Sequence, residues 1–290
     1  MPSFTALTTL DGEGAARALA EALERMVPEP YGVGVFDIED GSGRWEVGAY
    51  FHEEPDGVIL EILATAFGAN SFAVSEVPEA DWVAKVQREL HPVDAGRFFV
   101  YGSHDRDRVP EGRVALEIEA AMAFGTGHHN TTLGCLLAFD RLYEAGFRPM
   151  NIADIGAGTA VLAMAAAKVL PEARVLASDI DPVAVDVARA NLAVNGLADR
   201  VACVEAAGFD HVTIRKAAPF DLVFANILKG PLIELAPEMA RHTAPGGLVI
   251  LSGLLMVQAE AVIECYVASQ FRLRSRDDLG EWTALVLERL

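Results

Sequence analysis

The sequence predicts an α/β protein whose open, mostly parallel sheet ends in an antiparallel hairpin, preceded by a smaller ferredoxin-like α+β domain. Three observations carry this prediction. Residues 151–182 have the pattern strand, glycine turn, helix and strand. The last two expected strands, Phe271–Arg276 and Trp282–Glu288, are joined by a loop too short for a parallel crossover, so they must pair antiparallel. Residues 3–77 follow the order β-α-β-β-α-β of the ferredoxin-like fold.

The composition excludes several classes of protein. A chain of 290 residues with 52% hydrophobic residues and a mean hydropathy of +0.26 is long and apolar enough for two folded domains. No apolar stretch is long enough to span a bilayer, and Met1–Leu10 has no export signal. Cys135, Cys203 and Cys265 are widely spaced and match neither a disulfide framework nor a metal motif. We expect a cytoplasmic protein without a metal and without membrane association.

The net charge of −19 bears on the choice of partner. Such a surface repels nucleic-acid phosphates, so we expect no direct nucleic-acid binding. It would attract a basic substrate over long range, although solubility alone also accounts for an acidic composition. We expect a monomer.

Residues 1–92 are expected to form the ferredoxin-like domain. Its role is either to stabilise the chain or to hold a macromolecular substrate. The expected elements are strands at Ser3–Leu10, Tyr31–Ile38, Trp45–Phe51 and Ser71–Val77, and helices at Gly14–Met26 and Val58–Phe67.

Residues 93–122 are expected to be a linker with connecting strands. A short amphipathic helix at Asp81–Leu90 precedes this segment, and Phe98–Tyr101 is expected to be a strand. The polar run Gly102–Gly112 has the composition of a linker or an exposed loop.

The catalytic domain is expected over residues 123–290. It opens with a polar, glycine-containing stretch at Ala123–Thr132 that leads directly into a helix, with Asn130 as the expected N-cap. The pair His128–His129 is interpreted either as loop hydrogen bonding or as a proton-transfer group, and no third residue is spaced to complete a metal site.

The stretch between the first two strands of this domain has the features of a nucleotide site. Gly156 and Gly158 have no Cβ, so the backbone can turn tightly and a ligand can lie against it. Asp179 ends the second strand, where its carboxylate can accept hydrogen bonds from both hydroxyls of a ribose.

The spacing of this turn favours one nucleotide over others. A dinucleotide fingerprint places its third small residue at Val161, which fits poorly, and no Walker lysine follows. The pattern D-x-G-x-G-x-G of S-adenosylmethionine enzymes matches at Asp154, Gly156 and Gly158, with Ala160 in place of the last glycine. The turn therefore predicts an adenosine-type ligand, with S-adenosyl-L-methionine preferred.

The rest of the chain continues the sheet. A helix is expected at Pro182–Asn195 with Asp181 as its N-cap, and the strand Asp221–Leu228 carries Asn226 near its end. Ligands of open parallel sheets bind beyond the carboxyl ends of the strands, so Asn226 lies where chemistry is expected. The alternative is a turn residue that caps the following helix, Leu232–Met239. Further elements are expected at Val201–Glu205 (strand), Leu248–Leu251 (strand) and Met256–Ser269 (helix).

The order of elements is the one expected of a class I methyltransferase with a Rossmann-like sheet. In addition, the stretches AFGTGHHNTT, DIGAGTAVLA, SDIDP, FANILKGPLIELAP and APGGLVILSGLL resemble the PrmA family, the bacterial methyltransferases of large-subunit ribosomal protein eleven. The similarity runs from Ala123 to Trp282. Ala157 and Ala160 stand where relatives often have Cys and Gly.

The resemblance implies an enzyme that moves methyl groups from S-adenosyl-L-methionine to lysine side-chain amines and to the N-terminal α-amine of ribosomal protein eleven. It implies that the cofactor is held at Thr132, Gly156, Asp179 and Asn226, with Gly158 making room in the turn, and that residues 1–92 recognise the substrate. Asn226 is also expected to position the amine.

Three alternatives remain at this point. The first is a methyltransferase of the same fold that acts on another protein or on a small molecule. The second is a nicotinamide-dependent dehydrogenase, against which the Val161 mismatch and the terminal hairpin count. The third is a cofactor-binding module without enzymatic activity.

Overall fold

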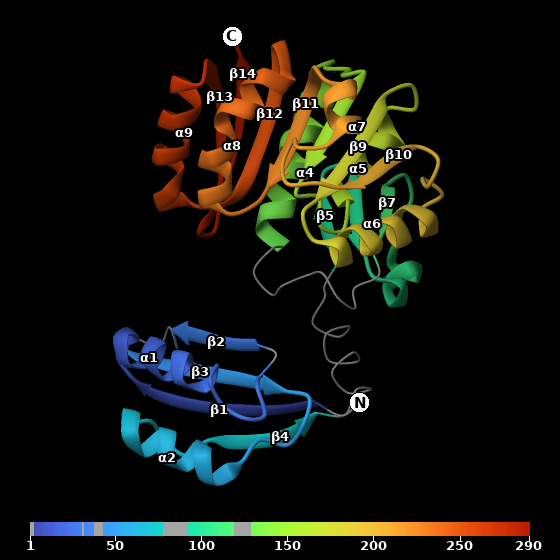
Figure 1. The fold of residues 1–290 in the computed structure, drawn as a ribbon. Helices are drawn as coiled ribbons and strands as arrows, with labels where there is room; N and C mark the ends of the chain where they lie inside the picture. The colour runs from blue at the N-terminus through green and yellow to red at the C-terminus, as the bar shows by residue number, and fades with distance from the viewer. Residues whose placement is uncertain (1–2, 31, 38–42, 78–91, 119–128) are drawn as a thin grey trace. The chain divides into compact units, whose positions relative to one another are not determined.

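The structure is a computed structural model that describes residues 3–30, 32–37, 43–77, 92–118 and 129–290 (Figure 1). The chain divides into two compact units, Met1–Val86 and Gln87–Leu290. The predicted helix at Asp81–Leu90 lies outside the described residues. The functional division at residues 1–92, 93–122 and 123–290 stays a prediction.

The smaller unit has the predicted ferredoxin-like fold. Its elements are β1 (Ser3–Asp11), α1 (Glu13–Leu23), β2 (Gly32–Asp37), β3 (Arg44–Phe51), α2 (Gly57–Phe67) and β4 (Ala73–Val77). The strands form an antiparallel sheet in the order β2-β3-β1-β4. Leu19 and Leu23 of α1 pack with Val47 and Phe51 of β3, which buries one face of the sheet. Alternation in the strands and helical spacing in α1 are sufficient to produce this core.

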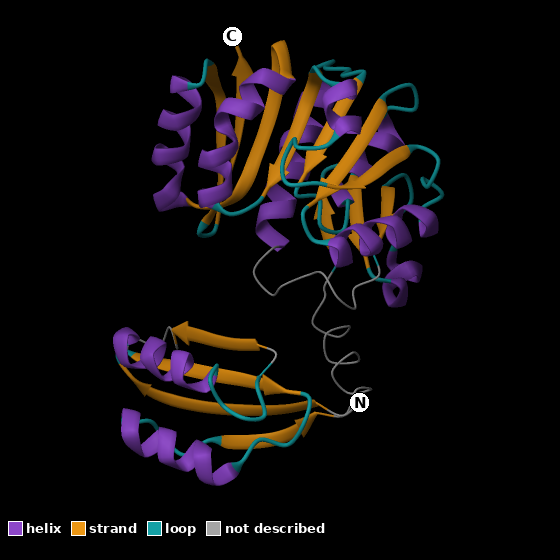
Figure 2. Ribbon diagram, in the orientation of Figure 1, coloured by secondary structure: helices purple, strands orange, loops and turns teal. Residues whose placement is uncertain are grey.

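The larger unit is built around a seven-stranded sheet in the order β10-β9-β8-β11-β12-β14-β13 (Figure 2). Its first five strands are parallel, and the predicted antiparallel hairpin closes it. The strands are β8 (Asn151–Ile155), β9 (Arg174–Asp179), β10 (Val201–Glu205), β11 (Phe220–Asn226), β12 (Thr243–Leu255), β13 (Phe271–Leu279) and β14 (Trp282–Arg289).

Helices cover both faces of this sheet. They are α4 (His129–Glu144), α5 (Val161–Val169), α6 (Pro182–Val194), α7 (Val212–Ala217), α8 (Lys229–His242) and α9 (Ala259–Ala268), the last preceded by the 3-10 turn η2 (Met256–Gln258). Leu222 and Phe224 of β11 pack in the core that contains α4, α5 and α6, whereas Val223 and Ala225 pack with α7, α8 and α9. The strands are therefore apolar on both faces, as expected for buried parallel strands.

Three short strands form a further sheet in the order β5-β6-β7. Its buried residues belong to the same hydrophobic core as α4, α5 and one face of the seven-stranded sheet. They are β5 (Val93–Ala95), β6 (Phe98–Tyr101) and β7 (Val114–Glu117). Phe98 of β6 stacks on Phe139 of α4 with ring centroids 5.8 Å apart. The predicted loop Gly102–Gly112 contains the 3-10 helix η1 (Ser103–Arg108), with Asp105 buried. Strands of three or four residues have too short a pattern to predict β5 and β7 from sequence.

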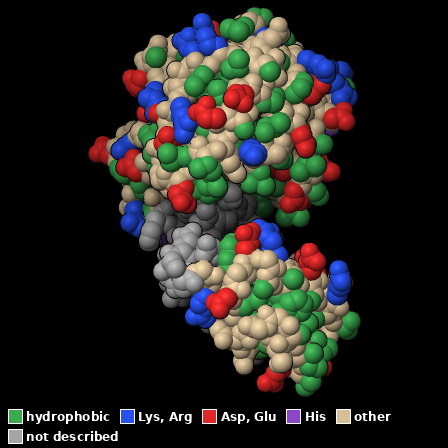
Figure 3. Space-filling view, turned by 90° about the vertical axis from the view of Figure 1, so that its left-hand side faces the viewer, with side chains coloured by type: hydrophobic (Ala, Val, Ile, Leu, Met, Phe, Trp, Pro, Cys, Tyr) green, Lys and Arg blue, Asp and Glu red, His purple; other side chains and the backbone are tan. Residues whose placement is uncertain are grey.

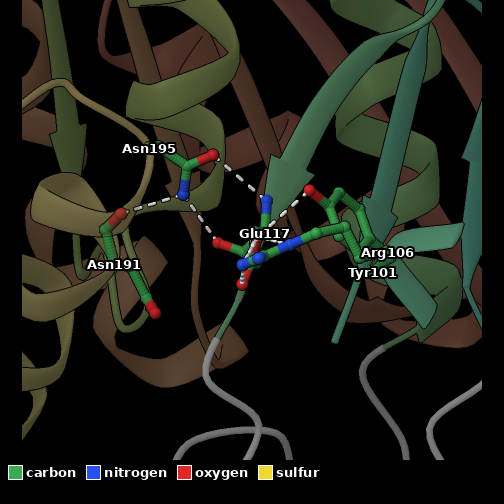
Figure 4. Close-up of polar contacts among 5 residues, drawn as sticks. All are labelled: Tyr101, Arg106, Glu117, Asn191 and Asn195. Atoms are coloured by element: carbon green, nitrogen blue, oxygen red, sulfur yellow. Dashed lines mark hydrogen bonds and ion pairs between the residues drawn. The ribbon is translucent and has the colours of Figure 1, made fainter. Parts of the chain in front are cut away.

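Glu117, at the end of β7, connects this small sheet to the end of α6 through hydrogen bonds (Figure 4). Its buried carboxylate accepts hydrogen bonds from Arg106 (2.6 Å to Nη2) and from the hydroxyl of Tyr101 (3.2 Å). Asn195, directly after α6, bonds the backbone N–H and C=O of Glu117 at 3.1 and 2.7 Å. The amide of Asn195 thus pairs with β7 as a neighbouring strand would. Burial and the Glu117 carboxylate raise the pKa of Tyr101.

Two helix starts test the capping predictions. Asp181 is the N-cap of α6, and its carboxylate accepts a hydrogen bond from the N–H of Val183 at 2.8 Å, as predicted. The prediction for Asn130 is wrong, because α4 begins at His129 and Asn130 lies inside its first turn. A run of polar residues before a helix contains several possible caps, and sequence alone does not choose among them.

Candidate active site at the carboxyl edge of the sheet

The turn between β8 and α5 has an unusual backbone. Gly156, Gly158 and Ala160 have φ of +70°, +52° and +61°. A Cβ on Gly156 would lie 2.3 Å from Cγ2 of Ile227, so both the conformation and the space require glycine there. Next to Gly158, no atom of the described chain apart from its sequence neighbours lies within 4 Å of where a Cβ would stand. The turn is therefore closed on the side of Ile227 and open at Gly158, which suits a ligand lying against the backbone.

Asp179 ends β9 beside this turn. One carboxylate oxygen accepts a hydrogen bond from the N–H of Gly158 at 2.8 Å, and the other accepts from the N–H of Asp181 at 3.1 Å. These bonds fix the direction of the half-buried carboxylate. An ionised carboxylate has about four acceptor positions, so it can also receive two ribose hydroxyls.

Asp154, the first residue of the D-x-G-x-G pattern, is only 1% exposed and plays a different part. Its carboxylate accepts a hydrogen bond from the N–H of Ala163 at 3.0 Å and so satisfies a free donor in the first turn of α5. Burial raises the pKa of Asp154 to about 7; the bond from Ala163 lowers it, and the nearby Asp179 carboxylate raises it. Asp154 supports the turn from inside.

Asn226 and Thr132, which are 94 residues apart, meet at the same edge. The amide nitrogen of Asn226 lies 3.4 Å from the hydroxyl of Thr132, which is buried in α4. The other end of the amide, Oδ1, is buried and accepts no hydrogen bond from any described residue. Buried polar atoms of this kind usually have a partner. A ligand at this edge can supply one.

Asn226 does not cap the helix that follows. The N-cap position of α8 is Leu228, whose side chain makes no capping hydrogen bond. The alternative interpretation of Asn226 as a capping residue is therefore wrong, and its side chain is directed to Thr132.

Other predicted positions are not tested. Residues 123–128, including His128, lie outside the described residues, and His129 is described only as the start of α4. Within the described ranges, no group of three or more His, Cys, Asp or Glu side chains could hold a metal ion. Over the same residues, no helix combines the length and the apolar character needed to cross a bilayer.

Two residues at this edge were missed by the sequence analysis. Ile180, directly after Asp179, is 69% exposed and offers an apolar surface beside the carboxylate. Asn191 in α6 is fully buried and donates a hydrogen bond to the carbonyl of Thr159 in the glycine turn at 3.1 Å. The position of Ile180 directly after Asp179 could have been recognised in the sequence. No pattern in the residues around Asn191 indicates that its side chain reaches the glycine turn.

These features fit S-adenosyl-L-methionine: an open glycine turn, a carboxylate fixed beside it and, at the end of the neighbouring strand β11, a buried amide oxygen that no described residue binds. Together with the doubly covered parallel sheet and its antiparallel hairpin, they define a class I, S-adenosyl-L-methionine-dependent methyltransferase.

A profile of the family described as "Ribosomal protein L11 methyltransferase (PrmA)" matches residues 5–290. The chain belongs to this family, which confirms the resemblance seen in the sequence. The dehydrogenase and the non-enzymatic module are set aside, because the chain is a methyltransferase.

Individual members of this family are similar to the chain over almost their whole length. The ribosomal protein L11 methyltransferase of Bradyrhizobium diazoefficiens is 45% identical over 294 residues, covering 100% of this chain and 98% of the relative. That of Brucella melitensis biotype 2 is 42% identical over 285 residues, covering 98% of each chain. The crystal structure of a ribosomal protein L11 methylase from Lactobacillus delbrueckii subsp. bulgaricus superposes with a TM-score of 0.60 at 27% identity, covering 69% of this chain and 98% of that one.

Proposed function

We propose that this enzyme moves methyl groups from S-adenosyl-L-methionine to ribosomal protein L11, on lysine side-chain amines and on the N-terminal α-amine. The observation that carries the proposal is the Oδ1 of Asn226, which is buried and has no hydrogen-bond partner among the described residues, at the edge where the glycine turn is open. An oxygen in this position can accept a hydrogen bond from an amine. The substrate itself is inferred from the names of the relatives.

We propose that Asp179 holds the ribose of the cofactor, that the backbone at Gly156 and Gly158 makes room for it, and that Thr132 and Asn226 line its methionine end. Support comes from the fixed direction of the Asp179 carboxylate and from the contact between Thr132 and Asn226. The bound cofactor supplies an electrophilic methyl group on a sulfonium. The protein contributes position and electrostatics.

Asn226 would orient the incoming amine. Because its Nδ2 is directed to Thr132, its Oδ1 is left to accept a hydrogen bond from the amine N–H, which turns the nitrogen lone pair away from Asn226. A lysine amine has a reference pKa of about 10.4 and must lose its proton before it can attack. His128 and His129 stay candidates for this proton transfer by their sequence position alone.

The substrate polypeptide would lie over an apolar rim formed by Leu228, Met256 and Val257. Leu228 and Val257 are 66% and 89% exposed, and Met256 is partly exposed. β11 and β12 are parallel neighbours in which Asn226 pairs with Ser252, so the segments that follow them leave the sheet side by side. A polypeptide that brings an amine to Asn226 must pass over these segments.

We propose that the smaller unit, with residues 1–92 as its functional extent, recognises the substrate. Residues 1–86 contain 16 acidic and 4 basic side chains, a net charge of −12 within the chain's total of −19. Such a concentration of charge attracts a basic protein and repels nucleic acid. We further propose that the enzyme works in the cytoplasm as a monomer, without binding nucleic acid or membranes.

Label transfer tests the proposed activity. The enzyme is incubated with S-adenosyl-L-methionine carrying a labelled methyl group and with purified ribosomal proteins, and peptides are mapped by mass spectrometry. We expect label on lysine and N-terminal amines of ribosomal protein L11. Label on a different protein, or none on any, would contradict this substrate. In cells lacking the chain, ribosomal protein L11 should lose the corresponding methyl masses.

A further inference from the structure

The glycine turn contains a residue whose conformation needs support. Ala160 has φ of +61°, in the left-handed region that side chains with a Cβ disfavour, and it is fully buried. It is also the N-cap of α5, and its own methyl side chain cannot accept a hydrogen bond from the helix. Other contacts must therefore hold the peptide group between Thr159 and Ala160 in place.

Several contacts hold the turn. The N–H of Ala160, which belongs to this peptide group, donates to the carbonyl of Ala157 at 2.8 Å. The carbonyl of Ser178 in β9 accepts hydrogen bonds from the N–H groups of Gly156 and Ala157 at 2.8 and 2.9 Å. Asp154 binds the first turn of α5 from below. None of these contacts reaches the carbonyl of Thr159, which precedes the strained residue.

That carbonyl is bound by Asn191. The side chain lies in α6, is fully buried, and donates from Nδ2 to the Thr159 oxygen at 3.1 Å. A carbonyl oxygen fixed in this way resists rotation of the Thr159–Ala160 peptide, and that rotation is the motion by which Ala160 would relax to negative φ. The bond is made in a dry interior, where such contacts are strongest.

We infer that Asn191 is a positioning residue for the methyl donor: it keeps the glycine turn in the shape that receives S-adenosyl-L-methionine without touching that molecule. The inference rests on the cofactor site proposed above. Its consequence is that loss of the Asn191 amide lowers cofactor affinity by releasing Ala160, beyond any effect on the stability of the fold.

The chain offers a matched control in Asn195, one helical turn further along. Asn195 has the same side chain, but its amide bonds the backbone of Glu117 in β7 and the backbone carbonyl of Asn191, and not the glycine turn (Figure 4). Replacing Asn195 by Ala removes partly buried amide hydrogen bonds, including one to the backbone of Asn191, while leaving the bond from the Asn191 side chain to the turn in place. A role limited to stability would make the two variants alike.

The test measures binding of S-adenosyl-L-methionine to the full chain by calorimetry, together with thermal unfolding of the free protein. We expect Asn191→Ala to raise Kd by about tenfold, as the loss of one buried hydrogen bond implies. Asn195→Ala should leave Kd within about twofold of the wild-type value, a shift too small to represent loss of such a bond. Adding Ala160→Gly to Asn191→Ala should recover much of the affinity, because glycine adopts the left-handed conformation without strain.

Hydrogen exchange provides a second readout in the free protein. The amide of Ala160 should exchange faster in Asn191→Ala than in the wild type, and no faster in Asn195→Ala. If Asn191→Ala does not fold, Asn191→Ser, which leaves a smaller change in volume, serves in its place with the same expectations.

Wild-type affinity in the Asn191 variant, or failure of Ala160→Gly to restore binding, would overturn the inference. The proposed cofactor site itself would be overturned if the wild-type protein bound no S-adenosyl-L-methionine, or if Asp179→Ala bound it with wild-type affinity. The two failures are thus distinguishable.

Discussion

Asp179 and Asp154 lie on either side of the same glycine turn and differ in what surrounds them. Asp179 is half-buried and takes its hydrogen bonds from backbone N–H groups at the ligand side. Asp154 is buried beneath α5. Two carboxylates that bind the same turn and the helix after it can therefore have separate tasks, one toward the ligand and one toward the fold.

Replacement of Asp179 by Ala should abolish measurable binding of S-adenosyl-L-methionine. The variant loses the proposed ribose acceptor and the bond that holds the N–H of Gly158. Calorimetric titration checks this, with Asp186→Ala, which removes an exposed carboxylate on α6, as the control. Unchanged affinity in the Asp179 variant would refute the assignment.

Replacement of Asp154 by Asn should change how stability depends on pH. The pKa of Asp154 is raised from 3.8 to about 7 in the folded protein, so the wild type loses stability as the pH rises between these values. The uncharged variant, whose Oδ1 can still accept from Ala163, escapes that loss.

Thermal unfolding of the free protein at several pH values measures this effect. From about pH 4 to about pH 8, the melting temperature of Asp154→Asn should rise by several degrees relative to the wild type. Most of the gain should come below pH 7. A difference between the two proteins that stays constant over this range would contradict the raised pKa.

At the scale of elements, Asn226 pairs with Ser252 across β11 and β12, and the exposed apolar residues Leu228, Met256 and Val257 follow the ends of these two strands. Each of these strands leads into a helix of the same face, α8 or α9, so their carboxyl ends open on one surface. The arrangement follows from parallel topology, which brings every strand end to the same edge.

Replacing Leu228 or Val257 by Ser should raise KM for ribosomal protein L11 several-fold while leaving the affinity for S-adenosyl-L-methionine unchanged. Each change removes exposed apolar area that a bound polypeptide would cover. Initial-rate kinetics with the protein substrate measure the effect. Val267→Ser, which alters an exposed valine near the opposite end of α9, is the control and should behave as wild type. Equal KM values in all three variants would place the substrate elsewhere.

At the scale of the whole molecule, charge is distributed unevenly. Residues 1–86 carry a net charge of −12, whereas both signs are scattered over the visible face of the larger unit (Figure 3). The excess of acid in the smaller unit is consistent with attraction of a basic partner, which acts mainly on the rate of encounter.

Raising the ionic strength from about 0.05 M to about 0.3 M should therefore raise KM for ribosomal protein L11 several-fold, because screening shortens the reach of the field. The value of kcat, which reflects steps after encounter, should change by less than about twofold. Steady-state kinetics at several salt concentrations measure both KM and kcat. A KM that does not depend on salt would show that recognition does not use this charge.

The sequence alone determined the two folds, the order of most elements, the glycine turn with its acid and the family. These rest on signals carried by neighbouring residues: periodic apolar positions, glycine where φ is positive, and a loop too short for a crossover. Local signals of this kind act before distant parts of the chain meet, so they can be recognised in the sequence.

Only the tertiary structure decided which distant polar groups meet. It joined Asn226 to Thr132 and Asn191 to Thr159, attached the short strands β5 to β7 to the larger unit, and showed that Asp154 supports α5. A buried amide or carboxylate must find a partner, but the identity of that partner depends on the path of the whole backbone, which no local pattern specifies.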